Sequence, residues 1–196
     1  MRESISNLRT EIVESQDGTK RYSLKKVWDE SKPSMAVVMM CPSSSGEVAV
    51  DTSTMLTLGN CYRLGYGSVT IVNLFATIND FSLKHSTSDD AENLETIAKA
   101  VEAASCVVFA PGTGKAKNRL FMEVQKEVLL ALRPYEDKLH CLCDKNGGSR
   151  YLHPLSPRVR EWHLAPLSIS ELIDVPVVME QEKVTSKGKN AKKGKV

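Results

Sequence analysis

The sequence predicts an α/β protein: a three-layer α/β/α sandwich around a four-stranded parallel sheet, with a β-hairpin at the N-terminal side. Four short apolar runs rich in β-branched residues recur at 35–40, 68–75, 106–110 and 138–143. Segments of helical character lie between them, and this alternation is typical of βαβ units. Each run is continuously apolar rather than alternating, as expected of strands that helices cover on both faces.

Between the first two runs, Met55, Leu58, Gly59 and Tyr62 recur at the spacing of one helix face. This pattern predicts an amphipathic helix that packs on the sheet through these side chains. Gly65 follows as a stop signal.

Two longer helices are expected after the second and third runs. The first has Ser88 as a candidate N-cap and acidic residues in its first turn, and its apolar stripe is Leu94, Ile97, Ala98 and Val101. The second is expected from about Lys117 to the residues before Pro134, with an inward face of Phe121, Val124, Val128 and Leu132. Right-handed crossovers then place helices on both faces of the sheet. A short helix is expected at 168–173.

Upstream of the first run, residues 10–14 and 21–24 have the character of strands, and the turn between them contains Gly18. We expect a β-hairpin over about residues 9–28 that extends one edge of the sheet.

The chain has 196 residues, 41% of them apolar, which fits one globular domain, here expected over residues 1–182. Six of the 26 basic residues lie in the acid-free segment 183–196, which leaves 20 basic against 24 acidic residues in the domain. This lysine-rich segment is predicted to be disordered. Two roles stay open for it: a solubilising terminus, or an arm that binds nucleic-acid phosphates.

The composition also indicates where the protein resides. No run approaches the roughly 18 apolar residues that span a bilayer, and the N-terminus lacks the apolar centre of a signal peptide. Five cysteines, an odd number, favour buried free thiols over a disulfide framework. We therefore expect a cytoplasmic protein without a membrane partner.

Polar and glycine-rich segments follow each predicted strand, at 41–46, 73–77, 111–115 and 144–157. Ligands of open parallel sheets bind beyond the carboxyl ends of the strands, where such loops meet. Cys41 with His153 could form a nucleophile and base, or Cys41 could be a small buried thiol. Asp51 could serve the site or only cap the following helix.

The segment 111–115 contains Gly112, Gly114 and Lys115 and could hold an anion at the start of a helix, or be an ordinary turn. It is not a Walker A motif, which needs glycine where Phe109 stands and serine or threonine where Ala116 stands. We predict no metal and no cofactor, because no second Cys/His pair accompanies the cysteines of the fourth run at zinc spacing.

Five motifs in order give the sequence a resemblance to DUF1643, a bacterial and phage family of unknown function, over about residues 21–167. They are Arg21–Leu24 with Trp28, Cys41–Ser44, Asp51–Thr54, Asn73–Ala76 and His153–Leu155. The pattern is in turn similar to the uracil-DNA glycosylase superfamily, whose members also have a four-stranded parallel sheet.

The second resemblance implies roles for individual residues. Cys41-Pro42 falls on the motif that positions the hydrolytic water, Asn73 on the asparagine that reads the base, and His153 on the histidine that donates to the base oxygen. Phe75 would stack on the base. Cys41 departs from the Asp or Asn of that superfamily, and Asp51 is the nearest acid that could replace it.

We therefore expect a protein that binds a base or nucleotide, free or within nucleic acid, and that either hydrolyses an N-glycosidic bond or acts on a nucleotide by related chemistry. The alternatives are a non-catalytic nucleic-acid or nucleotide-binding module with a lysine-rich arm, and a nucleotide-phosphate enzyme centred on 112–115. The candidate catalytic residues are Cys41, Asp51 and His153, and the candidate binding residues are Pro42, Ser43, Ser44, Asn73, Phe75, Gly112 and Lys115.

Overall fold

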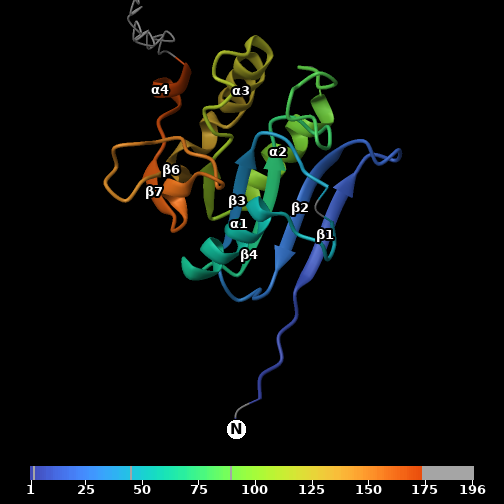
Figure 1. The fold of residues 1–196 in the computed structure, drawn as a ribbon, viewed down its shortest axis with the longest axis vertical. Coiled ribbons are helices and arrows are strands. Elements are labelled where there is room, and N and C mark those ends of the chain that lie inside the picture. Colours follow the sequence, from blue (N-terminus) through green and yellow to red (C-terminus); the bar gives the residue numbers. More distant parts are fainter. Residues whose placement is uncertain (2, 45, 89, 174–196) are drawn as a thin grey trace, which may run out of the picture.

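The computed structural model describes residues 1, 3–44, 46–88 and 90–173, and the lysine-rich segment 183–196 lies outside them. Seven strands form one mixed sheet in the order β1-β2-β4-β3-β5-β6-β7 (Figure 1). The strands are β1 Arg9–Glu14, β2 Arg21–Val27, β3 Ser34–Met39, β4 Ser68–Asn73, β5 Cys106–Phe109, β6 Leu139–Cys143 and β7 His163–Pro166.

The four predicted apolar runs form the centre of this sheet, as parallel neighbours in the order β4-β3-β5-β6. The expectation of a four-stranded sheet is nevertheless wrong, because three antiparallel strands extend it. The predicted N-terminal hairpin is present, and its second strand, β2, pairs with β4. At the other edge β7 pairs with β6. This last strand is four residues long and none of its side chains is buried, so it carries no apolar run that the sequence could reveal.

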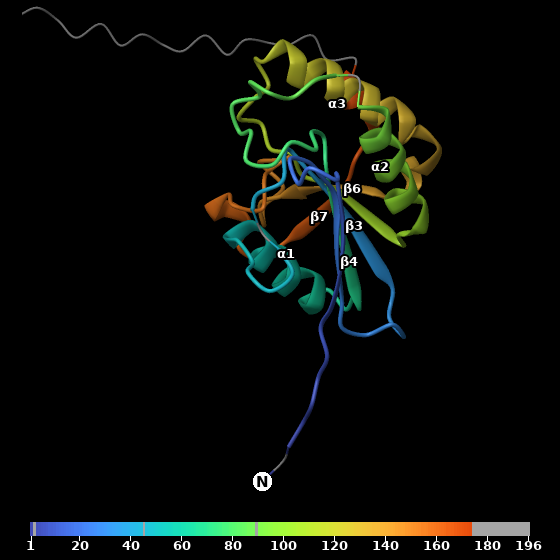
Figure 2. The ribbon, with the colours of Figure 1, turned by 90° about the vertical axis from the view of Figure 1, so that its right-hand side faces the viewer.

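Helices cover both faces of the sheet (Figure 2). On one side, α1 (Thr52–Arg63) packs over a core that includes Leu24, Val37, Ile71 and Trp162. On the other side, α2 (Ala91–Ala103) and α3 (Arg119–Ala131) enclose a core that includes Val38, Ile97, Phe109 and Phe121. The remaining helical segments are η1 (Arg133–Lys138), η2 (Pro157–Val159) and α4 (Ile169–Ile173). The predicted α/β/α layering is therefore present.

Helix α1 forms where expected but buries a different face. Met55 and Tyr62 of the predicted stripe are 54% and 69% exposed. The buried side chains are instead Thr54, Thr57, Asn60 and Cys61. The side chain of Asn60 donates to the carbonyl of Arg160 and accepts from the backbone N–H of Trp162, and these hydrogen bonds make burial of a polar residue acceptable.

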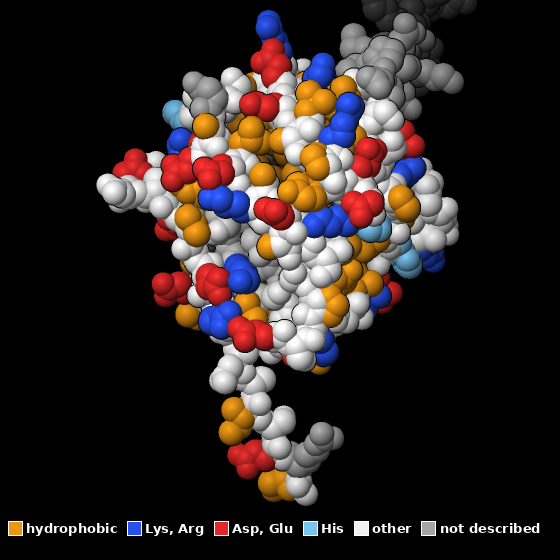
Figure 3. Space-filling view, turned by 180° about the vertical axis from the view of Figure 1, so that it is seen from behind, with side chains coloured by type: hydrophobic (Ala, Val, Ile, Leu, Met, Phe, Trp, Pro, Cys, Tyr) orange, Lys and Arg blue, Asp and Glu red, His pale blue; other side chains and the backbone are white. Residues whose placement is uncertain are grey.

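The other two long helices follow their predicted faces. Ile97 and Val101 of α2 are buried, as are Phe121, Val124, Val128 and the C-cap Leu132 of α3. The caps are Asp90 and Asn118, each within two residues of the predicted start. Figure 3 views the molecule from behind and shows acidic and basic side chains interspersed, without a large block of either sign.

All five cysteines are free thiols, and four of them are buried. No helix within the described residues has the length and apolar character needed to cross a bilayer.

Candidate functional site

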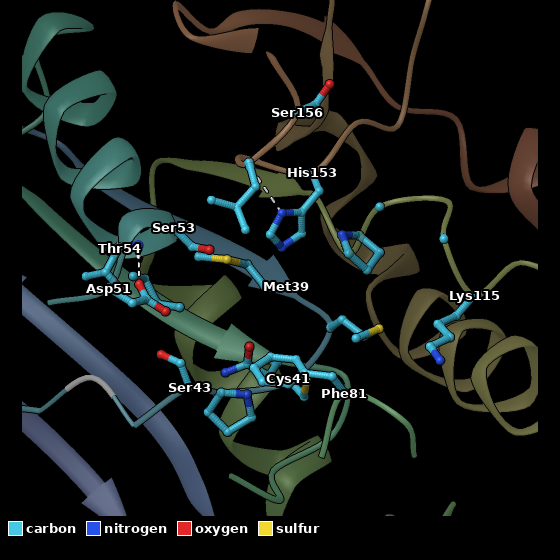
Figure 4. A pocket seen from close by; sticks show the side chains of 18 of the residues that line it. Met39, Cys41, Ser43, Asp51, Ser53, Thr54, Phe81, Lys115, His153 and Ser156 are labelled. Carbon is cyan, nitrogen blue, oxygen red and sulfur yellow. Dashed lines mark hydrogen bonds between the residues drawn. The ribbon is translucent and has the colours of Figure 1, made fainter. Parts of the chain in front are cut away.

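A cavity of about 540 Å³ opens beyond the carboxyl ends of the central strands. Its walls come from the loops after β3, β5 and β6, the end of β4, the start of β2 and the N-terminus of α1 (Figure 4). Eight of the ten predicted site residues line it: Cys41, Pro42, Ser43, Asp51, Asn73, Gly112, Lys115 and His153. Residues that are far apart in sequence therefore meet at one site.

Asn73 ends β4 and is 2% exposed. Its side-chain nitrogen Nδ2 has no hydrogen-bond partner among the described residues, although it lies in the wall of the cavity. A buried amide donor without a partner costs on the order of 1–3 kcal/mol, so such a group is a strong pointer to a ligand.

The backbone around Asn73 is held from the neighbouring helix. The amide of Asn93 on α2 donates to the carbonyl oxygens of Asn73 and Leu74, at 3.0 Å each. In addition, the N–H of Leu74 donates to the carbonyl of Met39 on β3. The Asn73 side chain therefore projects from a rigid strand end.

His153 lies in the loop after β6, and Figure 4 shows its ring within the cavity. Its Nδ1 accepts a hydrogen bond from the N–H of Leu155 at 3.1 Å. Burial lowers the pKa of His153, and the nearby charge of Asp51 opposes this only in part. The ring is therefore neutral at pH 7, and because Nδ1 accepts, Nε2 carries the proton and is a donor.

Gly112 supports this histidine from the β5–α3 loop. Its φ is +79°, in the left-handed region that favours glycine, and a Cβ at this position would lie 3.0 Å from the Cβ of His153. Both its conformation and the closeness of His153 therefore require glycine. The predicted glycine loop acts here at least as a packing surface for the imidazole.

Asp51 is both a helix cap and part of the cavity wall. Its carboxylate accepts from the N–H of Thr54 at 2.7 Å, which caps α1. It also interacts electrostatically with two other lining residues, Arg21 and His153. Arg21 is almost completely buried at the start of β2, and its burial lowers its pKa while the charge of Asp51 opposes that shift.

Cys41 follows β3 and is half-buried. Burial, together with the charge of Asp80, raises the pKa of Cys41 to about 12, and Lys115 offsets this only in part. The thiol is therefore neutral at pH 7, which argues against the nucleophile that the sequence left open.

The two remaining predicted residues, Phe75 and Ser44, do not line the cavity. Phe75 is 2% exposed and belongs to the core under α2 and α3, so it is not available to stack on a ligand. An aromatic side chain reaches the cavity from another position: Phe81 lines it and is 52% exposed.

The turn that carries Phe81 is ordered by the buried carboxylate of Asp80. This carboxylate accepts from the N–H groups of Lys84 and His85 and from the hydroxyl of Ser86, at 2.8–2.9 Å. Burial alone would raise the pKa of Asp80, but these hydrogen bonds outweigh it and lower the pKa to about 2. Phe81 is therefore presented by a well-supported turn.

The family model described as protein of unknown function, DUF1643, matches residues 21–155. The chain belongs to the DUF1643 family. The matched region begins at Arg21 and ends at Leu155, and both residues line the cavity. Neither the curated proteins nor the solved structures contain a match.

Sequence reasoning missed several lining residues of this DUF1643 protein, among them Arg21, Ser53, Phe81 and Ser156. Arg21 could have been recognised, because it begins a strand whose other residues are mostly buried, and a buried charge requires a partner. Phe81 could not have been recognised, since a lone aromatic residue in a polar loop does not show where it points.

Within the described residues of this DUF1643 protein, no group of three or more His, Cys, Asp or Glu side chains is placed to hold a metal ion. The chemistry available at the cavity is that of an amide, an imidazole, a carboxylate, two cations and several hydroxyls.

Proposed function

We propose that this cavity binds a nucleobase, through the Nδ2 of Asn73 and the Nε2–H of His153. The buried, unpartnered donor of Asn73 is the observation that carries the proposal. Two donors that line one cavity suit a ligand that carries two acceptor atoms. The volume of about 540 Å³ lies within the range of about 300–1,000 Å³ typical of small-molecule sites.

The donor pattern favours a pyrimidine. An asparagine amide offers a donor and an acceptor side by side, and the histidine adds a second donor. Uracil and thymine present an acceptor, a donor and an acceptor along one edge, which complements such a pattern. Phe81 takes the stacking role that the sequence assigned to Phe75, because it is the aromatic side chain that reaches the cavity.

The same groups fit hydrolysis of an N-glycosidic bond. When the bond between the sugar carbon and the base nitrogen breaks, its electron pair leaves with the base, and a donor at the base oxygen stabilises that charge. The Nε2–H of His153 is such a donor. Water then supplies hydroxide to the sugar carbon, and its proton goes to the base. Asp51 is the carboxylate that lines the cavity and would orient this water, whereas the neutral thiol of Cys41 is a poor group for the task.

The test is an assay for base release. Uracil, hydroxymethyluracil and mismatched thymine in single- and double-stranded oligonucleotides, together with the free nucleosides and nucleotides, are incubated with the protein, and the released base is separated by chromatography. We expect release that Asn73→Ala abolishes and Asn146→Ala preserves, because Asn146 lies in an exposed loop outside the cavity. Release that survives in Asn73→Ala would exclude the proposed site.

A second candidate is a non-catalytic binding module, and the neutral thiol of Cys41 favours it, because Cys41 then cannot activate water. This alternative predicts binding of oligonucleotides without base release. It also predicts that deletion of residues 183–196, which hold six lysines, weakens that binding and flattens its dependence on salt. An unchanged affinity at low salt would exclude a role for the lysine-rich segment.

A further inference from the structure

The charges around the cavity are distributed unevenly. On one side, Asp51 at the start of α1 and Arg21 at the start of β2 interact and balance each other. On the other side, the β5–α3 loop contributes Lys115 (Figure 4). Figure 4 shows the ring of His153 between Asp51 and Lys115. The cavity therefore has a balanced end, a neutral centre and a cationic end.

The ammonium group of Lys115 has no ion pair or hydrogen bond with any residue that the structure describes. It is half-buried, and its positive charge acts on the Cys41 thiol in the cavity wall, where the negative charge of Asp80 has the larger and opposite effect. Among the described residues that line the cavity, the buried amide of Asn73 and this cation are therefore two donors of different kinds without a protein partner, whereas Arg21 interacts with Asp51. A ligand that satisfies both carries a hydrogen-bonding edge and an anionic group.

We propose that the natural ligand is a free nucleoside monophosphate, whose base lies at Asn73 and His153 and whose phosphate lies at Lys115. This inference rests on the proposed function, because it assumes a base at the centre of the cavity. Phosphate is the anionic group that distinguishes a nucleotide from a nucleoside. An ammonium group beside a glycine-containing loop is a suitable partner for it.

The charge of the protein favours a free ligand over a nucleic-acid strand. Proteins that bind duplexes neutralise several phosphates with a row of lysines and arginines. Residues 1–182 hold 20 basic residues against 24 acidic ones. Among the described residues that line the cavity, Lys115 is the cation without a protein partner. One such cation matches one phosphate.

The experiment compares nucleosides with their 5′-monophosphates. Uridine, thymidine and cytidine, each with and without the phosphate, and inorganic phosphate alone are titrated into the full-length protein by calorimetry. We expect at least one monophosphate to bind about tenfold or more tightly than its nucleoside, because a hydrogen bond to a charged group contributes that much. Lys115→Ala should remove this difference. Lys117→Ala, an exposed lysine of the same loop outside the cavity, should preserve it.

The other outcomes separate the two proposals. Equal binding of nucleoside and monophosphate, or equal behaviour of the two lysine variants, would overturn the phosphate site and leave the base site intact. Tighter binding of a single-stranded oligonucleotide than of the monophosphate would overturn the free ligand. If inorganic phosphate alone binds as tightly as the monophosphate, the cation is an unspecific anion site. Absence of binding by every nucleoside, nucleotide and oligonucleotide would remove the proposed function as well.

Discussion

The side-chain amide of Asn93 donates to the backbone carbonyl of Asn73 from a distance of 3.0 Å. A second hydrogen bond of the same length reaches the carbonyl of Leu74. A helix on one face of the sheet thereby fixes the strand end from which the candidate base-reading side chain projects. Asn93 does not line the cavity, so its role is to position Asn73.

Replacing Asn93 should therefore affect both the fold and the site. Asn93→Leu leaves two buried carbonyls without a donor, and we expect the free energy of unfolding to fall by about 1–3 kcal/mol. We also expect weaker ligand binding at temperatures where the variant stays folded, because the end of β4 is no longer held. Urea denaturation and calorimetric titration measure the two effects. Loss of stability with unchanged affinity would show that Asn93 does not position the site.

Gly112 and Gly114 form a matched pair in one loop. Gly112→Ala forces a side chain into a backbone with φ of +79° and brings its Cβ to 3.0 Å from His153. We expect a loss of about 1–2 kcal/mol in stability and a displaced imidazole, with ligand affinity lowered about tenfold. Gly114→Ala should neither lower the stability nor displace the imidazole, because no atom lies within 4 Å of the added Cβ. Equal stabilities in the two variants would contradict the support of His153 by Gly112.

The thiol of Cys41 should react slowly. With a pKa of about 12, its thiolate fraction at pH 8 is far below that of free cysteine, whose pKa is about 8.5. We expect alkylation by iodoacetamide at pH 8 to be slower than for free cysteine by about a hundredfold or more. Mass spectrometry of the Cys41 peptide measures the rate. A rate equal to that of free cysteine would restore the nucleophile that the sequence left open.

The turn that presents Phe81 should depend on pH through Asp80. The pKa of this carboxyl is lowered to about 2 in the folded protein, below its ordinary value of 3.8, so its hydrogen bonds stabilise the fold fully above about pH 5. This contribution, about 2 kcal/mol, is mostly lost as the pH falls from about 5 to 2. Asp80→Asn should flatten the fall of stability between pH 5 and 2 in thermal denaturation. An identical pH dependence in variant and wild type would contradict this role.

The centre of the fold was accessible from the sequence because its four strands are buried on both faces. Their side chains form continuous apolar runs, and the stripes of α2 and α3 fit a helix that packs on such a sheet. The edge strand β7 and the packing of α1 were harder to predict from the sequence. β7 carries no buried side chain, and α1 packs through Thr54, Thr57 and Asn60, whose burial depends on partners distant in sequence.

The candidate site followed from a rule of topology rather than from any single motif. Loops after parallel strands meet at one edge, and this rule brought Cys41, Asn73, Gly112 and His153 together correctly. The rule does not show whether a side chain beyond the end of a strand points into the cavity or into the core. Phe75 turns into the core two residues after Asn73, whereas Phe81 returns to the cavity because the hydrogen bonds of Asp80 order its turn.

The most direct test of the base site is a titration of uridine 5′-monophosphate and thymidine 5′-monophosphate into the wild type and two variants. Asn73→Asp keeps the size of the side chain but replaces the Nδ2 donor with an acceptor, and Asn146→Asp makes the same change in an exposed loop. We predict that the wild type and Asn146→Asp bind equally, and that Asn73→Asp, confirmed as folded by circular dichroism, binds about tenfold or more weakly. Undiminished binding by folded Asn73→Asp would contradict the central claim that this amide reads a base.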